Sequence, residues 1–444
     1  MLSRKAQSKI DRWISKGKRA LLVSGARQVG KTYLIRKCLN DAKQNYLEIN
    51  LIEHPELVEV LSKSMTVDDL VINLSAAMNY SFVKNETVIF IDEVQELTDI
   101  VSRIKFWVDE GSYRYILSGS LLGVELKSIR SAPVGYLDEI TMYPLDFEEF
   151  VTASGVTEET IQYLKECFEE VKEVGQTVHE KMMTHFRRYL VVGGMPAAVQ
   201  EYVDSGNMNE VSVIQNNIIA FYKRDFTKYE KERKRLMLTD IYDQIPSQLL
   251  KQNRRFNYAD IKKGLRYERV EDSFIWLTAA GVAIPTYNAT EPRVALNQNR
   301  KSSLLKLYSS DVGLLTCQCG DAIRLKILME DEKINLGGVY ENAVAQEMHA
   351  HGFPTYFYNS HKQGELDFVI EKDAAVVPIE VKSGKNYYEH SALTKVVNNA
   401  EYDVREAYLF TNYSTTSSGK VKNLPVYMSA FIRNETKLPV LESL

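Results

Sequence analysis

The chain has 444 residues, of which 45% are hydrophobic and 26% are charged. A chain of this length exceeds what one hydrophobic core usually supports, so we expect roughly two to four domains. The formal net charge of −4 excludes a protein that is basic overall, so any nucleic-acid contact must come from local positive patches. The N-terminus is polar and no apolar run approaches the length of a bilayer, so we expect a cytoplasmic protein without a membrane partner.

The first third of the chain alternates short apolar runs with amphipathic stretches, which is typical of a parallel sheet wrapped by helices. The runs predicted as strands are Arg19 to Ser24, Asn45 to Leu51, Thr87 to Ile91, Tyr113 to Leu117 and Glu139 to Met142. We therefore predict an α/β domain with a parallel sheet over residues 1–146.

The rest of the chain falls into three predicted parts. Residues 147–235 are mainly helical in pattern, which predicts a helical lid or bundle. Over residues 236–320, short helical stretches lead into two apolar runs that indicate a hairpin, so we predict a winged-helix unit there. Residues 321–444 mix one helix with several strands, which predicts a further α/β domain.

A glycine-rich segment follows the first predicted strand. Its sequence, Gly25-Ala26-Arg27-Gln28-Val29-Gly30-Lys31-Thr32, matches the pattern GxxxxGK[ST] in full. In such loops the glycines let the backbone wrap closely around phosphates, while N–H groups and the positive end of the next helix bind the β-phosphate. These eight residues therefore predict an ATP site in which Lys31 reaches the β and γ oxygens and Thr32 ligates Mg²⁺.

Two acidic residues follow the third predicted strand. In open parallel sheets, ligands bind at the carboxyl ends of the strands, where Asp92 and Glu93 are expected. We expect Asp92 to hold Mg²⁺ through water and Glu93 to polarise the attacking water as a catalytic residue. The adjacent pair therefore predicts hydrolysis of the nucleotide.

The next predicted strand ends in Ser118-Gly119-Ser120, whose hydroxyls could sense the γ-phosphate. The sequence does not rank the two serines, and a plain strand end explains either one equally well; we take Ser118 as the candidate. No arginine that would reach a neighbouring nucleotide can be identified. The candidates, each more readily explained as a structural or solvated residue, are Arg114, Arg130, Arg187, Arg188 and Arg224.

These motifs resemble the AAA-type branch of P-loop ATPases, and more narrowly a prokaryotic family described only as ATP-binding proteins. The segments that carry the resemblance are Gly25 to Thr32, Ile91 to Gln95, Ser118 to Ser120, Tyr143 to Phe150, Gly193 to Pro196 and Ser310 to Leu315. In that family the ATPase core precedes a domain of unknown function with winged-helix and restriction-endonuclease-like parts. The resemblance thus implies this architecture for nearly the whole chain.

Two predicted strands near the C-terminus carry acidic residues and a lysine. They run from Gly364 to Ile370 and from Ala375 to Ser383, joined by a polar turn as in a hairpin. Because side chains alternate along a strand, Glu380 and Lys382 share one face, and Asp367 can meet them across the turn.

This arrangement resembles the PD-(D/E)xK nuclease pattern, although Leu366 stands where the pattern has proline. The resemblance implies that Asp367 and Glu380, together with the carbonyl of residue 381, bind one or two Mg²⁺ or Mn²⁺ ions. Glu341 on an upstream helix supplies the additional metal-binding acid of the pattern. Lys382 is implied as the catalytic residue that orients or activates the attacking water.

Other readings of the C-terminal residues stay open. The hairpin could be an ordinary surface hairpin, or a nuclease fold kept for DNA binding without cleavage. The basic and aromatic stretch from Lys251 to Tyr267 could lie on a nucleic-acid backbone or be a solvated helical face. His349 and His351 would point in different directions from one helix, so we reject a zinc site built on them.

We therefore expect a Mg²⁺-dependent ATPase coupled to a nuclease-like module that acts on nucleic acid, DNA more readily than RNA. The alternative is a nucleotide-switched signalling or scaffold protein whose C-terminal module binds a partner or DNA without cleaving it. A homo-oligomer is compatible with either function.

Overall fold

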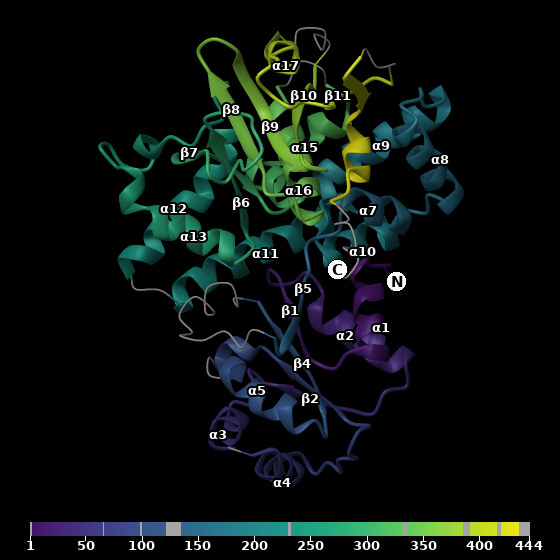
Figure 1. The fold of residues 1–444 in the computed structure, drawn as a ribbon, viewed down its shortest axis with the longest axis vertical. Helices are drawn as coiled ribbons and strands as arrows, with labels where there is room; N and C mark the ends of the chain where they lie inside the picture. Colours follow the sequence, from purple (N-terminus) through teal and green to yellow (C-terminus); the bar gives the residue numbers. More distant parts are fainter. Residues whose placement is uncertain are drawn as a thin grey trace, which may run out of the picture. The chain divides into compact units, whose positions relative to one another are not determined.

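The computed structural model describes residues 2–64, 66–97, 100–120, 135–229, 232–331, 335–384, 391–414 and 419–434. The chain divides into two compact units. The N-terminal unit holds residues 2–143 and 279–281, and the C-terminal unit holds residues 144–278 and 282–444. Each unit contains one β-sheet (Figure 1). Among the described residues, no helix is both long and apolar enough to cross a membrane.

The N-terminal unit is built on a parallel sheet, as predicted. Its strand order is β2-β3-β4-β1-β5, and every pairing is parallel. All five predicted strands are confirmed to within a residue or two. They are β1 (Ala20–Ser24), β2 (Tyr46–Asn50), β3 (Val88–Asp92), β4 (Arg114–Gly119) and β5 (Leu137–Thr141).

Helices cover this sheet and complete its core. They are α1 (Ala6–Lys16), α2 (Lys31–Asp41), α3 (Glu56–Lys63), α4 (Val67–Met78) and α5 (Ile100–Glu110), with a short 3-10 turn η1 (Val94–Glu96). Strands β1 and β3 are buried along their whole length, which explains why both read as continuous apolar runs. Because β3, β4 and β1 are neighbouring parallel strands, their carboxyl ends lie at the same edge of the sheet.

The C-terminal unit begins with a mainly helical region, which confirms the secondary structure predicted there. Its helices are α7 (Phe147–Ala153), α8 (Glu158–Glu169), α9 (Gln176–Val192), α10 (Pro196–Ser205), α11 (Met208–Tyr229) and α12 (Glu232–Leu249). Helix α7 starts with a capping box. The Asp146 side chain accepts a hydrogen bond from the Glu149 N–H, and the Glu149 side chain accepts one from the Asp146 N–H.

A mixed seven-stranded sheet forms the rest of this unit, in the order β12-β11-β10-β9-β8-β6-β7. Helix α16 contacts β6, β7 and β10, while α17 contacts β9 and β10. The elements are η3 (Tyr258–Asp260), η4 (Tyr267–Arg269), α13 (Glu271–Ala279), β6 (Ala283–Ala289), β7 (Arg300–Ser309), α14 (Val312–Cys319), α15 (Asp321–Leu328), α16 (Gly337–Ala350), β8 (Tyr356–Ser360), β9 (Gly364–Lys372), β10 (Ala375–Val381), α17 (Ser391–Val397), β11 (Ala407–Thr411), β12 (Val421–Pro425) and η5 (Val426–Phe431).

The predicted winged-helix unit over residues 236–320 is not a separate structure. Strands β6 and β7 do form the expected hairpin, but β6 also pairs in parallel with β8. That pairing satisfies the second edge of β6, so the hairpin extends the C-terminal sheet instead of forming a wing. A border at residue 320 would cut through this sheet, and the other predicted domain borders remain predictions.

Three of the segments that carried the family resemblance meet inside the C-terminal unit. The Gly194 N–H donates to Asp311 Oδ2 at 2.5 Å, and the Leu145 N–H donates to the Gly194 carbonyl at 2.7 Å. A Cβ at residue 194 would overlap the backbone of Leu145. Asp311 also caps α14 by accepting the Leu314 N–H at 2.9 Å. These segments therefore contact one another inside the C-terminal unit, so their residues have a structural role there.

Candidate functional site

The glycine-rich loop lies between β1 and α2, as the sequence predicts. Gly25 has a φ of 140° and Gly30 a φ of 89°, and both values favour glycine over any other residue. Gly25 also packs against the backbone of Met142, where a Cβ would overlap. The two glycines therefore let the loop turn tightly into the first turn of α2, where the backbone N–H groups of a helix start bind anions.

Lys31 is buried within this loop. Its Nζ donates to the carbonyl oxygens of Gly25 at 3.0 Å and Ala26 at 2.9 Å. Burial lowers the pKa of Lys31 to about 8, although the nearby Glu93 and Asp92 oppose the shift. The ammonium group is thus held at the loop by carbonyl oxygens that carry no formal charge.

Asp92 lies at the end of β3 and is buried. The Thr32 hydroxyl donates to Asp92 Oδ2 at 2.8 Å, and the Ser118 hydroxyl at the end of β4 donates to Asp92 Oδ1. Three residues that the sequence singled out on separate elements are therefore brought together. A carboxylate and hydroxyls at this position are the oxygen ligands that suit Mg²⁺.

Glu93 adopts a left-handed backbone conformation with a φ of 58°, which is uncommon for a residue with a side chain. Its carboxylate accepts a hydrogen bond from the amide of Gln95. The other end of that amide, Gln95 Oε1, accepts the Ser120 N–H at 3.4 Å. Gln95 thus connects Glu93 to the end of β4, a role that the sequence did not indicate.

A second supporting residue is Arg4, to which the sequence assigned no site. Its guanidinium donates to the Val29 carbonyl at 2.9 Å and to the Tyr143 carbonyl at 2.6 Å. Arg4 therefore ties the phosphate-binding loop to the segment that follows β5. The one signal in the sequence is that basic residues are frequent near the N-terminus, and such residues usually lie on solvated helix faces.

The arginines considered for contact with a neighbouring nucleotide have partners of their own. Arg114 donates to the Ile14 carbonyl and to Gln44, Arg187 pairs with Glu330, and Arg188 donates to the Tyr202 hydroxyl. Arg224 lies over the ring of Phe221. Arg130 lies outside the described residues.

In the C-terminal unit, the predicted acidic residues converge. Phe368 pairs with Ile379 in the antiparallel β9–β10 ladder, so Asp367 and Glu380 come next on either strand. The Val381 N–H donates to Asp367 Oδ2 at 2.9 Å. Together with Glu341 from α16 and Lys382 after β10, they form a cluster that we call the acidic site.

Two cations that the sequence did not single out for this site lie within it. Lys306 Nζ on β7 is 3.0 Å from Glu365 Oε1, 3.4 Å from Glu341 Oε2 and 3.6 Å from Asp367 Oδ1. Arg254, from the basic stretch after α12, forms an ion pair with Glu341 and lies 3.9 Å from Asp367.

The acidic groups differ in their electrostatics. Burial and the charge of Asp367 raise the pKa of Glu380 to about 8 and that of Glu341 to about 7. Burial also opposes ionisation of Asp367, but Lys306 and Arg254 outweigh it and lower the pKa of Asp367. Asp367 is thus the acid of the cluster that is most firmly held as a carboxylate.

The carboxyl groups of Glu341 and Glu380 differ in their hydrogen-bond partners. Glu341 Oε1 is bound by Arg254, and its Oε2 accepts the Tyr308 hydroxyl at 2.9 Å. Glu380 Oε1 pairs with Lys382 Nζ at 2.7 Å, whereas Glu380 Oε2 is buried without a hydrogen-bond partner among the described atoms. A buried carboxylate oxygen left in this state is costly and calls for a ligand. Asp367 and Glu380 therefore fit a divalent cation, while Glu341 is already committed to protein donors.

A cavity of about 760 Å³ opens on the acidic site. This volume lies in the range of sites that hold small ligands. The start of α16 also borders it, so backbone N–H groups at a helix N-terminus are close by. The charged residues that line it include Arg187, Arg254, Lys326, Asp367, Glu380 and Lys382.

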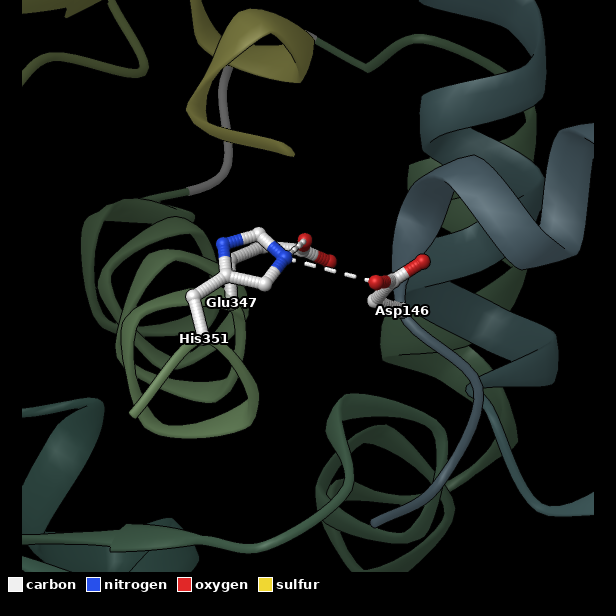
Figure 2. A group of neighbouring side chains, drawn as sticks. All are labelled: Asp146, Glu347 and His351. Carbon is white, nitrogen blue, oxygen red and sulfur yellow. Dashed lines mark hydrogen bonds and ion pairs between the residues drawn. The ribbon is translucent and has the colours of Figure 1, made fainter. Parts of the chain in front are cut away.

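A second group of metal-ligating side chains joins α7 and α16 (Figure 2). His351 Nε2 lies 3.3 Å from Asp146 Oδ2 and 3.7 Å from Glu347 Oε2. The other oxygen of each carboxylate accepts an N–H group in the first turn of α7, and the Arg433 guanidinium lies 2.9 Å from His351 Nε2. Because an arginine already supplies the cation, we assign this group to fastening α7 to α16. Sequence spacing could not reveal it, since Asp146 and His351 are 205 residues apart.

Comparison with known proteins divides the chain into three matched regions. Residues 17–151 match the model of an AAA domain. Residues 183–322 match a domain of unknown function (DUF8612), and residues 336–427 match another domain of unknown function (DUF4143). None of the curated proteins compared with the chain matches it.

The solved structures that match the chain share little sequence with it. A Walker-type ATPase of Pyrococcus abyssi is 16% identical, with 72% of this chain and 96% of that chain covered and a TM-score of 0.44. The Aeropyrum pernix ORC1 protein in complex with DNA is 11% identical, with 74% and 95% covered and a TM-score of 0.29. Similarities this low carry no conclusion about fold, ligands or function. The chain thus carries an AAA domain, which implies ATP binding and hydrolysis, followed by domains of unknown function.

Proposed function

We propose that the N-terminal unit hydrolyses ATP through Lys31, Thr32, Asp92 and Glu93. The observation that carries this assignment is the hydrogen-bonded group of Thr32, Asp92 and Ser118 beside the phosphate-binding loop. Thr32 and Asp92 would hold Mg²⁺, which supplies charge neutralisation of the phosphates when it is bound.

The remaining roles follow from position and charge. Lys31 exchanges the carbonyl oxygens of Gly25 and Ala26 for phosphate oxygens, which are stronger partners for an ammonium group. Glu93 orients the attacking water and accepts its proton, and Gln95 sets the direction of the Glu93 carboxylate. Ser118 acts through Asp92, to which it donates, as a positioning residue.

For the C-terminal unit, we propose metal-dependent cleavage of phosphodiester bonds in nucleic acid. The observation that carries this proposal is the buried, unpartnered Glu380 Oε2 beside Asp367 in a cavity lined by arginines and lysines. A divalent ion at Asp367 and Glu380 would supply Lewis acidity toward the scissile phosphate. Carboxylate oxygens on the facing strands of a hairpin are suitable ligands for Mg²⁺ or Mn²⁺.

The other residues of the acidic site receive separate roles. Lys382, which is paired with Glu380 and borders the cavity, orients the attacking water or stabilises the developing charge. Arg254, Lys326 and Arg187 line the same cavity and are suited to contact phosphate groups. Glu341 is reassigned from metal ligand to support, because protein donors occupy both of its oxygens.

An endpoint assay of cleavage tests this proposal. Purified full-length protein is incubated with end-labelled single- and double-stranded DNA and RNA, with Mg²⁺ or Mn²⁺, and with or without ATP. We expect cleavage, of DNA before RNA, that is lost with a chelator and in Glu380→Gln, which keeps the side-chain size but removes the charge. Nucleic acid that stays intact under every metal and nucleotide condition would refute cleavage.

The second candidate function is nucleic-acid binding without cleavage in response to nucleotide. It is favoured by the cations Arg254 and Lys306, which already offset the charge of the carboxylates before any ion is bound. Under this alternative, a mobility-shift assay would show a complex that forms without a divalent ion and is unchanged in Glu380→Gln.

A further inference from the structure

Lys306 is a charged residue in the interior of the C-terminal unit. It lies on β7 with a fully buried side chain, and its ammonium contacts carboxylates from both β9 and α16. The ammonium also lies 5.4 Å from the centre of the Phe357 ring. Three N–H donors therefore face three carboxyl groups and an aromatic face, which take the place of water around the ammonium.

The other cations of the acidic site are placed differently. The side chains of Arg254, Arg255 and Lys382 are 19%, 33% and 30% exposed, whereas that of Lys306 is 0% exposed. The three exposed cations border cavities and can turn toward an incoming phosphate. If Lys306 turned away, its own buried charge and those of Glu341 and Asp367 would lose an ion-pair partner.

The surroundings of Lys306 favour its charged form. Its ammonium lies within 3.6 Å of carboxyl oxygens of Glu341, Glu365 and Asp367, which are suitable partners for a charged lysine. Lys306 consequently contributes a full positive charge among the carboxylates, as a bound metal ion would.

A balance of charges follows for the described residues of the acidic site. With Glu365 included, the carboxyl groups of the site are those of Glu341, Glu365, Asp367 and Glu380, and they face four cations, which are Arg254, Arg255, Lys306 and Lys382. One divalent ion can be accommodated when one of the partly exposed cations turns away from the carboxylates. A second ion would place further positive charge beside the buried Lys306, at a large electrostatic cost.

We propose that the acidic site takes a single divalent ion, at Asp367 and Glu380, because Lys306 fills the position of a second cation. This inference rests on the proposed metal-dependent function of the site. Glu341 and Glu365, which could have helped to bind a second ion, are held by Lys306, Arg254 and Tyr308. Lys306 is thereby a positioning residue that sets the metal stoichiometry.

Titration of the nucleotide-free full-length chain with Mn²⁺ tests the proposal, by calorimetry and by electron paramagnetic resonance of the free ion. We expect one ion per chain, lost in Asp367→Asn and retained in Thr32→Ala, which alters only the nucleotide site. Two ions lost together in Asp367→Asn would overturn the proposal. No ion at all would instead refute the proposed metal-dependent function, so the two failures are distinguishable.

A matched pair of variants tests Lys306 directly. Lys306→Met removes the charge at similar length, so we expect it to bind a second Mn²⁺ or to bind the first at least about tenfold more tightly. Lys306→Arg keeps the charge and should keep one ion. Circular dichroism establishes that each variant is folded, and the wild-type stoichiometry decides the question if Lys306→Met does not fold. A folded Lys306→Met that binds one ion with unchanged affinity would refute the role of Lys306.

Discussion

The nucleotide site and the acidic site handle charge in different ways. In the nucleotide site, Asp92 is bound by the hydroxyls of Thr32 and Ser118, and Lys31 is bound by backbone carbonyls. These partners carry no net charge, so phosphate and a metal ion can replace them at small cost. Such a site is suited to repeated binding and release of a ligand.

The acidic site instead consists of carboxylates that already face cations. Lys306 and Arg254 hold Glu341 and Asp367, and among the described acids of the site only Glu380 keeps a buried oxygen without a hydrogen-bond partner. Removal of one member of a buried ion pair leaves the other uncompensated, so most of these residues stabilise the fold as well as the site. Clustering of acids therefore does not by itself identify metal ligands, because protein donors can already bind the carboxylate oxygens, as they do in Glu341.

The largest expected effect concerns the nucleotide site. Loss of a general base lowers turnover by roughly 100- to 10,000-fold, so Glu93→Gln should lose ATP hydrolysis to that extent while keeping nucleotide affinity. Steady-state hydrolysis and calorimetric binding measure the two quantities. Equal turnover in wild type and Glu93→Gln would show that Glu93 is not the base.

The next effect separates two acids of the acidic site. Glu341→Ala leaves Lys306 and Arg254 partly uncompensated, so the free energy of unfolding should fall by about 3–5 kcal/mol. Glu380→Gln replaces a buried carboxyl group whose pKa is raised, so that its ionisation is disfavoured in the fold, and should leave stability unchanged or increased. Denaturant unfolding of the two variants measures the contrast. Equal destabilisation by both variants would contradict the assignment of Glu341 as a supporting acid and Glu380 as a metal-binding acid.

Removal of the loop lysine should weaken nucleotide binding. Lys31→Ala removes charge-assisted hydrogen bonds worth about 1.5–3 kcal/mol each, so ATP affinity should fall roughly 100-fold. Calorimetry with ATP and Mg²⁺ measures the loss, and Asp367→Asn serves as a control with unchanged ATP affinity. A Lys31→Ala variant that binds ATP as tightly as wild type would remove the lysine from the site.

A smaller effect follows from the pKa of Lys31, which burial lowers to about 8. The protonated form binds phosphate, so affinity should be constant below pH 8 and fall by about tenfold per pH unit above it. Calorimetry between pH 7 and pH 9.5 tests this slope. Lys31→Arg, whose side chain stays charged, should show no such decline, and a decline in both proteins would point to another group.

The nucleotide site could be predicted from the sequence because its groups are local. The residues from Gly25 to Thr32 are consecutive, and Asp92 and Ser118 directly end two apolar strands whose carboxyl ends must meet. The supporting residues were missed for the opposite reason. Arg4 reaches the loop from the N-terminal segment, and no pattern in the sequence connects it to Val29.

The acidic site could be predicted only in part. Asp367, Glu380 and Lys382 lie on one hairpin, so the alternation of side chains places them together. Lys306 comes from β7, which belongs to the same sheet because β7 pairs with β6 and β6 pairs with β8. No pattern in the sequence predicts the parallel pairing of β6 with β8, which a long connection joins. The separate winged-helix unit was predicted wrongly for the same reason, because a local hairpin pattern says nothing about which strand pairs with its outer edge.

The most direct test of the account compares Mn²⁺ binding by Glu380→Gln and Glu341→Gln in the nucleotide-free full-length chain. Both variants replace a buried carboxylate by an amide of the same size, so they differ only in which acid is changed. We expect Glu380→Gln to lose Mn²⁺ affinity by at least about tenfold, because it removes a ligand, and Glu341→Gln to stay within a few-fold of wild type. Loss of Mn²⁺ binding in Glu341→Gln with retention in Glu380→Gln, or unchanged binding in both, would contradict the assignment of Glu380 as the ligand and Glu341 as its support.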